Sequence, residues 1–170
     1  MIIFLTGMMG TGKTEVGQAL AKSLKCTFLD LDHYLEKKTG KSIPEIFRTE
    51  GEEAFRKLER DIKHDPLPNT SDMVIATGGG FPLDETNREW MKSTGVVIWL
   101  QAEPQTILER VKMSENRPLL PQPLQPAHIQ QILDKRTFVY KQANYYIQTD
   151  GRSIRDIVRE ILEKLDKKNA

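Results

Sequence analysis

A glycine-rich stretch near the N-terminus constrains this chain more than any other feature. Residues 7–14 match the pattern G-x-x-x-x-G-K-[ST] in full. An apolar run at residues 2–6 comes before it, and a helical pattern with Val16, Leu20 and Leu24 on one face follows it. A glycine-rich turn between a strand and a helix is the setting in which this pattern binds phosphate. The sequence therefore predicts a phosphate-binding loop rather than a chance turn.

The residue types of this loop suit a nucleoside triphosphate bound with Mg²⁺. Glycines allow backbone N–H groups to face phosphate oxygens, and the helix N-terminus adds partial positive charge there. Lys13 is expected to reach the β- and γ-phosphates, and the Thr14 hydroxyl to bind the metal ion. Since the sequence lacks the N-K-x-D element of guanine recognition, ATP is the expected nucleotide. The loop residues predicted to bind ATP are Gly10, Thr11, Gly12, Lys13, Thr14 and Glu15.

Asp30 is a second candidate for the metal site. It ends an apolar run at residues 27–30, which is an expected strand. A strand-end carboxylate beside a phosphate loop can hold Mg²⁺ through water. An aspartate in this place is also a common turn residue, so both interpretations stay open at the level of sequence.

Composition limits the classes of function. The 170 residues fit one domain, residues 1–170, with a single core. Lys and Arg total 25 against 24 for Asp and Glu, so no basic surface for nucleic acid is expected. The one cysteine, Cys26, excludes an internal disulfide and favours a reducing compartment. The chain shows neither a signal peptide nor a membrane span. We expect a cytoplasmic protein that binds neither membrane nor nucleic acid.

Short apolar runs alternate with amphipathic helical patterns, which is typical of βα units and a mostly parallel sheet. Ser42 and Glu45 have the spacing of a capping box and predict the start of a short helix. Ser153 is expected to open the last helix. The expected strands are residues 2–6, 27–30, 73–77, 96–100 and 145–149.

Residues 113–126 show little periodicity. Four prolines in this stretch, Pro118, Pro121, Pro123 and Pro126, exclude a regular helix. A long irregular segment in a compact domain is usually a functional loop or a disordered one. Its position in the chain favours a lid over the bound substrates.

Three further features are candidates for the site of the phosphate acceptor. Asp32 follows Asp30 at a strand end, where open α/β sheets bind ligands. Arg56 and Glu59 share one face of a predicted helix, and the glycines at residues 78–80 allow close approach of a ligand to the backbone. Each feature has an ordinary alternative, namely a helix cap, a solvated surface pair or a loose turn. Taken singly, each is better explained by that alternative.

In combination and in this order, the motifs resemble those of the shikimate kinase family. The phosphate loop is shared with many kinases, whereas G-E-x-x-F-R-x-x-E at residues 51–59 and R-P-L-L at residues 117–120 are far more specific. The resemblance covers nearly the whole chain. The matching stretches are residues 7–14, 28–32, 47–59, 78–80 and 117–120, and Arg136 with Tyr140.

The resemblance implies a three-layer α/β P-loop kinase fold, in which helices flank a five-stranded parallel sheet beneath a mobile lid. It implies transfer of a phosphoryl group from ATP, with Mg²⁺, to the 3-hydroxyl of shikimate. Asp32 would take the proton of that hydroxyl. Arg56, oriented by Glu59, and Arg136 would hold the carboxylate, a group that suits bidentate guanidinium recognition. Arg117 on the lid would approach the transferring phosphoryl group.

The resemblance also completes the set of expected site residues. The catalytic residues would be Lys13, Asp32 and Arg117. Arg110, Arg117 and Arg152 would join the loop in binding ATP, with Arg110 stacked on adenine, and Thr14 and Asp30 would hold the metal. The substrate would contact Asp32, Arg56, Glu59, Gly78, Gly79, Gly80 and Arg136, the last two glycines meeting ring hydroxyls through backbone N–H groups.

Two classes of alternative remain open at this level, namely another P-loop kinase, for a nucleoside monophosphate or a sugar acid, and a nucleotide-binding module without catalysis. A kinase for a nucleoside monophosphate needs lid arginines for a second phosphate group, and residues 113–126 contain only Arg117. A kinase for a sugar acid such as gluconate is harder to exclude on charge alone. A nucleotide-binding module without catalysis should have lost Asp32, Arg56 or Arg136, and all three are present. A monomer is the expected state.

Overall fold

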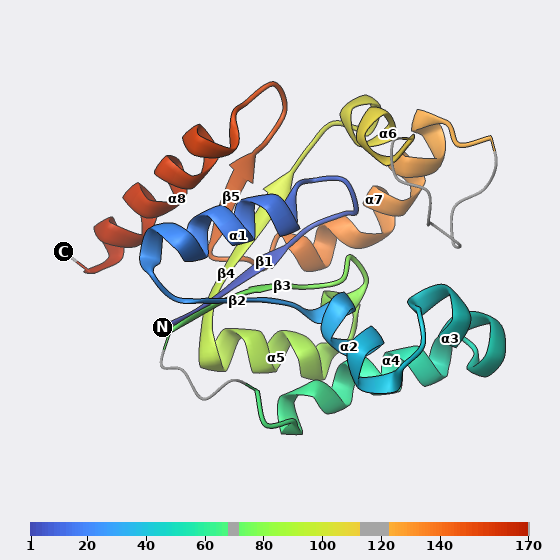
Figure 1. Cartoon of the computed structure of the whole chain (residues 1–170). Coiled ribbons are helices and arrows are strands. Elements are labelled where there is room, and N and C mark those ends of the chain that lie inside the picture. The colour runs from blue at the N-terminus through green and yellow to red at the C-terminus, as the bar shows by residue number, and fades with distance from the viewer. Residues whose placement is uncertain (68–71, 113–122, 170) are drawn as a thin grey trace.

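The computed structural model describes residues 1–67, 72–112 and 123–169. Its centre is a sheet of five strands in the order β2-β3-β1-β4-β5, and every neighbouring pair is parallel (Figure 1). The prediction of a parallel α/β sheet is confirmed. The strands are β1 (Ile2–Thr6), β2 (Thr27–Asp30), β3 (Met73–Ala76), β4 (Gly95–Gln101) and β5 (Tyr145–Gln148).

Helices cover both faces of the sheet, which gives three layers (Figure 1). The helices are α1 (Lys13–Leu24), α2 (Leu31–Thr39), α3 (Ile43–Glu50), α4 (Glu52–Asp61), α5 (Glu85–Thr94), α6 (Pro104–Lys112), α7 (Pro126–Tyr140) and α8 (Ile154–Asn169). Successive side chains of a strand point to opposite faces, so Ile3 and Leu5 belong to a buried cluster with α1 and α8, whereas Phe4 belongs to one with α2 to α5. Two short 3₁₀ helices, η1 (Ile62–His64) and η2 (Phe81–Leu83), follow α4 and β3.

Side-chain caps start several of these helices where the sequence predicts. The Ser42 hydroxyl accepts a hydrogen bond from the Glu45 N–H at 3.2 Å, and the Ser153 hydroxyl accepts one from the Asp156 N–H at 3.1 Å. Such caps satisfy N–H groups that have no partner inside the helix. Ser42 and Ser153 therefore mark the starts of α3 and α8 correctly.

The predicted bounds of three strands differ slightly from those observed. The strand expected at residues 73–77 ends at Ala76, the one expected at 145–149 ends at Gln148, and β4 is one residue longer at each end than predicted. Thr77 and Thr149 still donate backbone hydrogen bonds to Leu5 and Gln101, at 3.0 and 2.9 Å. These two residues continue the hydrogen-bond ladder of the sheet at the points where the chain begins to turn away from it.

The irregular stretch expected at residues 113–126 overlaps the start of α7. Pro126 is the first residue of that helix, a position where proline is tolerated because the first N–H groups of a helix have no internal partner. Residues 113–122, and with them Arg117, lie outside the described residues. Within the part of the chain that is described, no helix is long and apolar enough to cross a bilayer.

Candidate active site

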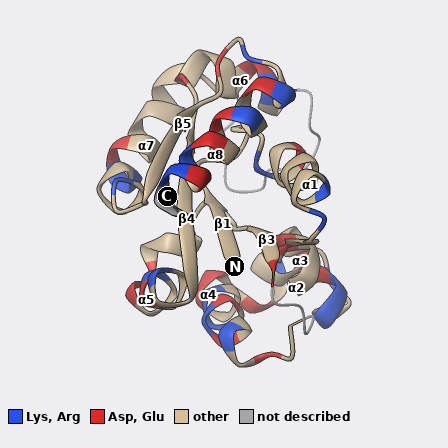
Figure 2. Cartoon of the chain, turned by 90° about the vertical axis from the view of Figure 1, so that its left-hand side faces the viewer, with Lys and Arg blue, Asp and Glu red and all other residues tan. Residues whose placement is uncertain are grey.

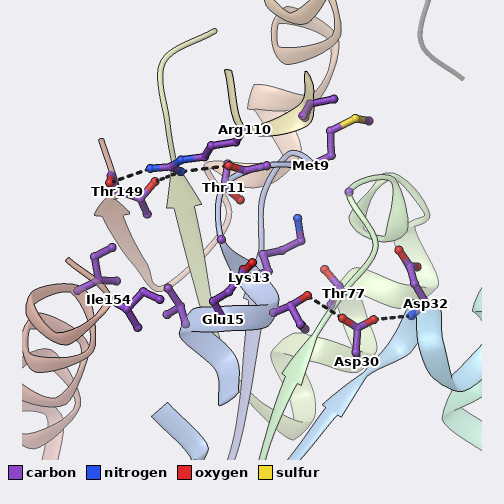
Figure 3. A pocket seen from close by; sticks show the side chains of 18 of the residues that line it. Met9, Thr11, Lys13, Glu15, Asp30, Asp32, Thr77, Arg110, Thr149 and Ile154 are labelled. Carbon is purple, nitrogen blue, oxygen red and sulfur yellow. Dashed lines mark hydrogen bonds between the residues drawn. The ribbon is translucent and has the colours of Figure 1, made fainter. Parts of the chain in front are cut away.

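A cavity of about 520 Å³ opens at the carboxyl ends of the strands (Figure 3). The phosphate loop between β1 and α1 forms its floor, and the ends of β2 and β3 close one side. This is the edge at which open parallel sheets bind ligands. The residues that line it include Met9, Gly10, Thr11, Gly12, Lys13, Thr14, Glu15, Asp30, Asp32, Thr77, Gly79, Arg110, Thr149, Arg152 and Ile154.

The phosphate loop depends on glycine at two positions in particular. Gly7 has φ of 138°, and a Cβ added there would lie 2.4 Å from the carbonyl oxygen of Leu100. Gly12 has φ of 91° and caps the N-terminus of α1. Residues that carry a side chain rarely adopt these backbone angles, so any residue other than glycine would strain the turn. The loop therefore has the glycine-dependent turn that the sequence predicts, and the first turn of α1 is directed at the cavity.

Lys13 lies across the inside of this loop. Its ammonium group donates hydrogen bonds to the carbonyl oxygens of Gly7 and Met8, at 2.8 and 2.9 Å. The Met8 carbonyl also accepts the Thr11 hydroxyl at 2.8 Å. The positive charge is thus held over the loop, where phosphate oxygens would be bound.

Thr14 and Asp30 both line the cavity, and the Thr14 hydroxyl donates a hydrogen bond of 2.8 Å to Asp30 Oδ2 (Asp30 is labelled in Figure 3). The other Asp30 oxygen accepts the N–H groups of Asp32 and His33 and caps α2. The structure is thus compatible with both interpretations of Asp30, as a turn residue and as a metal ligand. One carboxylate oxygen caps α2, and the other accepts the Thr14 hydroxyl. A hydroxyl and a carboxylate suit Mg²⁺, which takes few protein ligands and completes its shell with phosphate and water. No group of three acidic, histidine or cysteine side chains suited to a metal occurs among the described residues.

Two acidic side chains, those of Asp32 and Glu59, lie together against the glycine turn that follows β3. A Cβ on Gly78 would lie 2.8 Å from Asp32 Oδ1 and 3.2 Å from Glu59 Oε1. Asp32 comes from the first turn of α2 and Glu59 from α4, so the two carboxylates meet over one glycine. Any larger residue at Gly78 would displace one of them.

Arg56 lies beside these two carboxylates and the glycine turn. Its guanidinium donates to Glu59 at 2.7 Å and to Glu52 at 3.2 Å. The Glu59 side chain is only 3% exposed and that of Arg56 is 17% exposed. The alternative of a solvated surface pair is therefore wrong. Both terminal nitrogens of Arg56 lie 2.6 Å from the position that a Cβ on Gly80 would take, so the guanidinium rests against the turn.

Burial of Glu59 changes its protonation. Loss of water raises the pKa of this carboxyl from 4.5 to about 7, the nearby Arg56 works against the rise, and the charge of Asp32 adds to it. A carboxyl in this condition gains or loses its proton near neutral pH. Perturbed acids of this kind, in contact with specific charged partners, often mark functional sites.

Arg136 approaches the same turn from the opposite side, on α7. One of its nitrogens lies 3.1 Å from the position that a Cβ on Gly79 would take. One helical turn later, the Tyr140 hydroxyl donates a hydrogen bond of 2.6 Å to the Gly79 carbonyl oxygen. Arg136 thus lies against Gly79 and Arg56 against Gly80, while Asp32 lies against Gly78.

Arg110 and Arg152 lie at the other end of the cavity. Arg110, on α6, donates to the Gly10 carbonyl at 3.0 Å and to the hydroxyl and carbonyl of Thr149 at 3.1 and 3.2 Å (Figure 3). It therefore links the phosphate loop to the segment after β5. Arg152 donates to Glu160 at 2.6 Å and to the Gln148 carbonyl at 2.9 Å. Both arginines line the cavity, and their binding of ATP stays a prediction.

Comparison with known proteins assigns this arrangement to a family. The family model for shikimate kinase matches residues 9–166. The chain belongs to the shikimate kinase family. A shikimate kinase of Thermus thermophilus is 42% identical over 164 residues, which is 96% of this chain and 89% of the relative. That of a Sulfurihydrogenibium species is 40% identical over 98% of both chains.

Solved structures agree with this assignment. Shikimate kinase from Acinetobacter baumannii, in complex with shikimate, has a TM-score of 0.91 and 38% identity, covering 98% of this chain and 93% of that chain. Shikimate kinase from Aquifex aeolicus has a TM-score of 0.82, with 34% identity over 99% and 98% of the two chains. A gluconokinase from Sinorhizobium meliloti, at 16% identity and a TM-score of 0.55, shares the fold alone.

For this shikimate kinase family member, the structure groups most of the predicted site residues. The phosphate loop, Asp30, Asp32 and Arg110 line one cavity, and Arg56, Glu59 and Arg136 surround the glycine turn. Tyr140 belongs to the R-x-x-x-Y motif, but the sequence alone assigns it no role. Its spacing of four residues from Arg136 on a helix was the available signal, because such residues lie on one face.

Proposed function

We propose that this chain transfers the γ-phosphoryl group of ATP to the 3-hydroxyl of shikimate and releases ADP and shikimate 3-phosphate. The observation that carries the proposal is the convergence of Arg56 and Arg136 on residues 78–80, next to Asp32 and the phosphate cavity. A planar carboxylate is the natural partner of such guanidinium groups, because each can present two parallel donors. Family membership supports the same conclusion.

On the donor side, backbone N–H groups from Gly10 to Glu15 and the Lys13 ammonium bind the phosphates. Lys13 exchanges its present carbonyl partners for phosphate oxygens, which carry full negative charge. Thr14 and Asp30 would hold Mg²⁺, which would neutralise phosphate charge when bound. Arg110 and Arg152 bind the nucleoside end of ATP.

On the acceptor side, Arg56 and Arg136 hold the carboxylate and thereby fix the ring. Backbone N–H groups of Gly79 and Gly80 contact ring hydroxyls. The 3-hydroxyl oxygen bonds to the γ-phosphorus as the bond to the bridging oxygen of ADP breaks, and the proton passes to Asp32. Positioning and positive charge dominate catalysis of such transfers, and Lys13 and Arg117 supply the charge.

The product identifies the reaction. Wild-type protein mixed with MgATP and shikimate should give a phosphate monoester coupled to the ring proton at carbon 3 in ³¹P NMR spectra. The Lys13→Ala variant should fold normally and form this product at least about a hundredfold more slowly, because a contact to transition-state charge is lost. Phosphate release to water without a phosphate ester of shikimate, or equal rates for a folded Lys13→Ala protein, would contradict the proposal.

A further inference from the structure

The side chain of Tyr140 is fully buried at the end of α7, yet its polar end is directed at the glycine turn. The hydroxyl donates a hydrogen bond of 2.6 Å to the carbonyl oxygen of Gly79, although the two residues are 61 positions apart. The ring packs on Trp99, with 5.6 Å between the ring centroids. A buried hydroxyl with one short bond to a backbone carbonyl is held in a single orientation.

The peptide plane explains what this bond can control. The carbonyl of Gly79 and the N–H of Gly80 belong to one planar trans peptide, so they point in opposite directions. The Phe81 and Leu83 N–H groups hold the carbonyls of Gly78 and Gly80, at 3.1 and 3.0 Å, but neither bond fixes the peptide between Gly79 and Gly80. Glycine has no Cβ to restrict its backbone angles, so this peptide has more than one allowed orientation. A donor that holds the Gly79 carbonyl on the α7 side therefore fixes the Gly80 N–H on the other side.

The same helix face also places Arg136. Arg136 and Tyr140 are four residues apart on α7, and Arg136 lies 3.1 Å from the position of a Cβ on Gly79. Burial raises the pKa of the Tyr140 hydroxyl, while the charge of Arg136 and a side-chain hydrogen bond from Arg136 oppose the rise. The hydroxyl therefore keeps its proton, and its role as a donor, at neutral pH.

We infer that Tyr140 is a positioning residue for the phosphate acceptor: it holds the Gly79–Gly80 peptide so that the Gly80 N–H meets a ring hydroxyl of the substrate. This inference rests on the proposed function, since it concerns how shikimate is oriented. Tyr140 acts through the peptide and does not touch ATP. Its loss should weaken use of shikimate and leave use of ATP unchanged.

A matched pair of variants tests this role. Tyr140→Phe removes the hydroxyl and keeps the ring. Tyr146→Phe is the control, because the Tyr146 hydroxyl also donates to a backbone carbonyl, that of Lys141, and its ring also packs on Trp99, but at an exposed place. Tyr140→Phe should lower kcat/KM for shikimate about tenfold, the effect of one hydrogen bond of ordinary net strength, with KM for ATP unchanged. Tyr146→Phe should change neither.

The Gly80 amide gives a direct readout. In wild-type NMR spectra, shikimate should shift the Gly80 amide resonance. Tyr140→Phe should move this resonance in the free protein and reduce its response to shikimate, whereas Tyr146→Phe should do neither. A folded Tyr140→Phe protein with unchanged kcat/KM for shikimate, or an equal loss for both substrates, would overturn the inference.

Wild-type protein supplies a measurement that does not depend on the variant folding. The Tyr140 hydroxyl proton should exchange slowly enough with water to be observed, and its resonance should shift together with that of the Gly80 amide when shikimate is added. Lack of any coupled response would overturn the positioning role. If wild-type protein itself fails to phosphorylate shikimate, the proposed function is wrong, which is a different result from a silent Tyr140→Phe substitution.

Discussion

The burial of Glu59 depends on its surroundings in the fold and not on its local sequence. The sequence places it one helical turn from Arg56, a spacing that is common on solvated helices. In the structure its carboxyl is buried beside Asp32 and against the glycine turn. The spacing could be predicted from the sequence, but the burial could not, because it depends on how α4 packs against residues far away in the chain.

The buried carboxyl predicts a specific pH dependence of stability. The pKa of Glu59 is about 7 in the folded protein and near 4.5 when exposed, so the folded state holds the proton more tightly. The resulting stabilisation is complete below about pH 4.5 and is lost as the pH rises through about 7. Relative to Glu59→Gln, which cannot titrate, wild-type protein should lose about 2–3 kcal/mol of unfolding free energy between pH 5 and pH 8.

Urea unfolding of both proteins at the two pH values measures this difference. Comparing each protein with itself across pH cancels the constant effect of the substitution. Parallel pH profiles for wild-type and Glu59→Gln would show that Glu59 does not titrate in this range.

At the scale of elements, the phosphate loop and the acceptor cluster differ in how far the sequence predicts them. The loop is one continuous stretch, residues 7–14, and β1 and α1 follow directly from the patterns on either side. Its glycines, Lys13 and Thr14 could therefore be assigned from local chemistry. The acceptor cluster consists of residues on α2, α4 and α7 and in the turn after β3, namely Asp32, Arg56, Glu59, Arg136 and residues 78–80. At the level of sequence, only the resemblance to a family grouped these residues.

The two helices that carry the arginines yield a prediction. If α4 and α7 together hold the carboxylate, Arg56→Ala should weaken shikimate binding by roughly 2–5 kcal/mol, because a charged partner is left unpaired. ATP affinity should not change. Arg56→Lys should recover only part of the loss, since an ammonium cannot reproduce the planar fork.

Arg60→Ala is the matched control, because Arg60 lies one turn later on α4 and pairs with Glu53 and Asp84 on the outside. Calorimetry with shikimate should show no loss for this variant. Arg136→Ala should resemble Arg56→Ala, and the double variant should lose less than the sum of the two, because both arginines bind one group. Wild-type affinity in both single variants would leave these arginines without the proposed role.

At the scale of the whole molecule, the described part of a single chain supplies both halves of the site. The nucleotide half lies between the phosphate loop, α6 and the segment after β5, and the acceptor half lies between α2, α4 and α7 (Figure 1). We therefore propose that a monomer is sufficient for activity. Charged residues of both signs are spread over the helices (Figure 2). This distribution agrees with the net charge of +1 and with selection of an anionic substrate by local arginines rather than by a general field.

ADP formation from ATP in the presence of different acceptors tests the central claim most directly. ADP formation by the wild-type protein should be measured with shikimate, gluconate, nucleoside monophosphates and water alone under identical MgATP conditions. The proposed site predicts strong stimulation by shikimate, and rates close to those in water for the others, because they do not place a hydroxyl beside Asp32 while a carboxylate contacts Arg56 and Arg136. Stimulation by gluconate or a nucleotide, with shikimate no better than water, would contradict it.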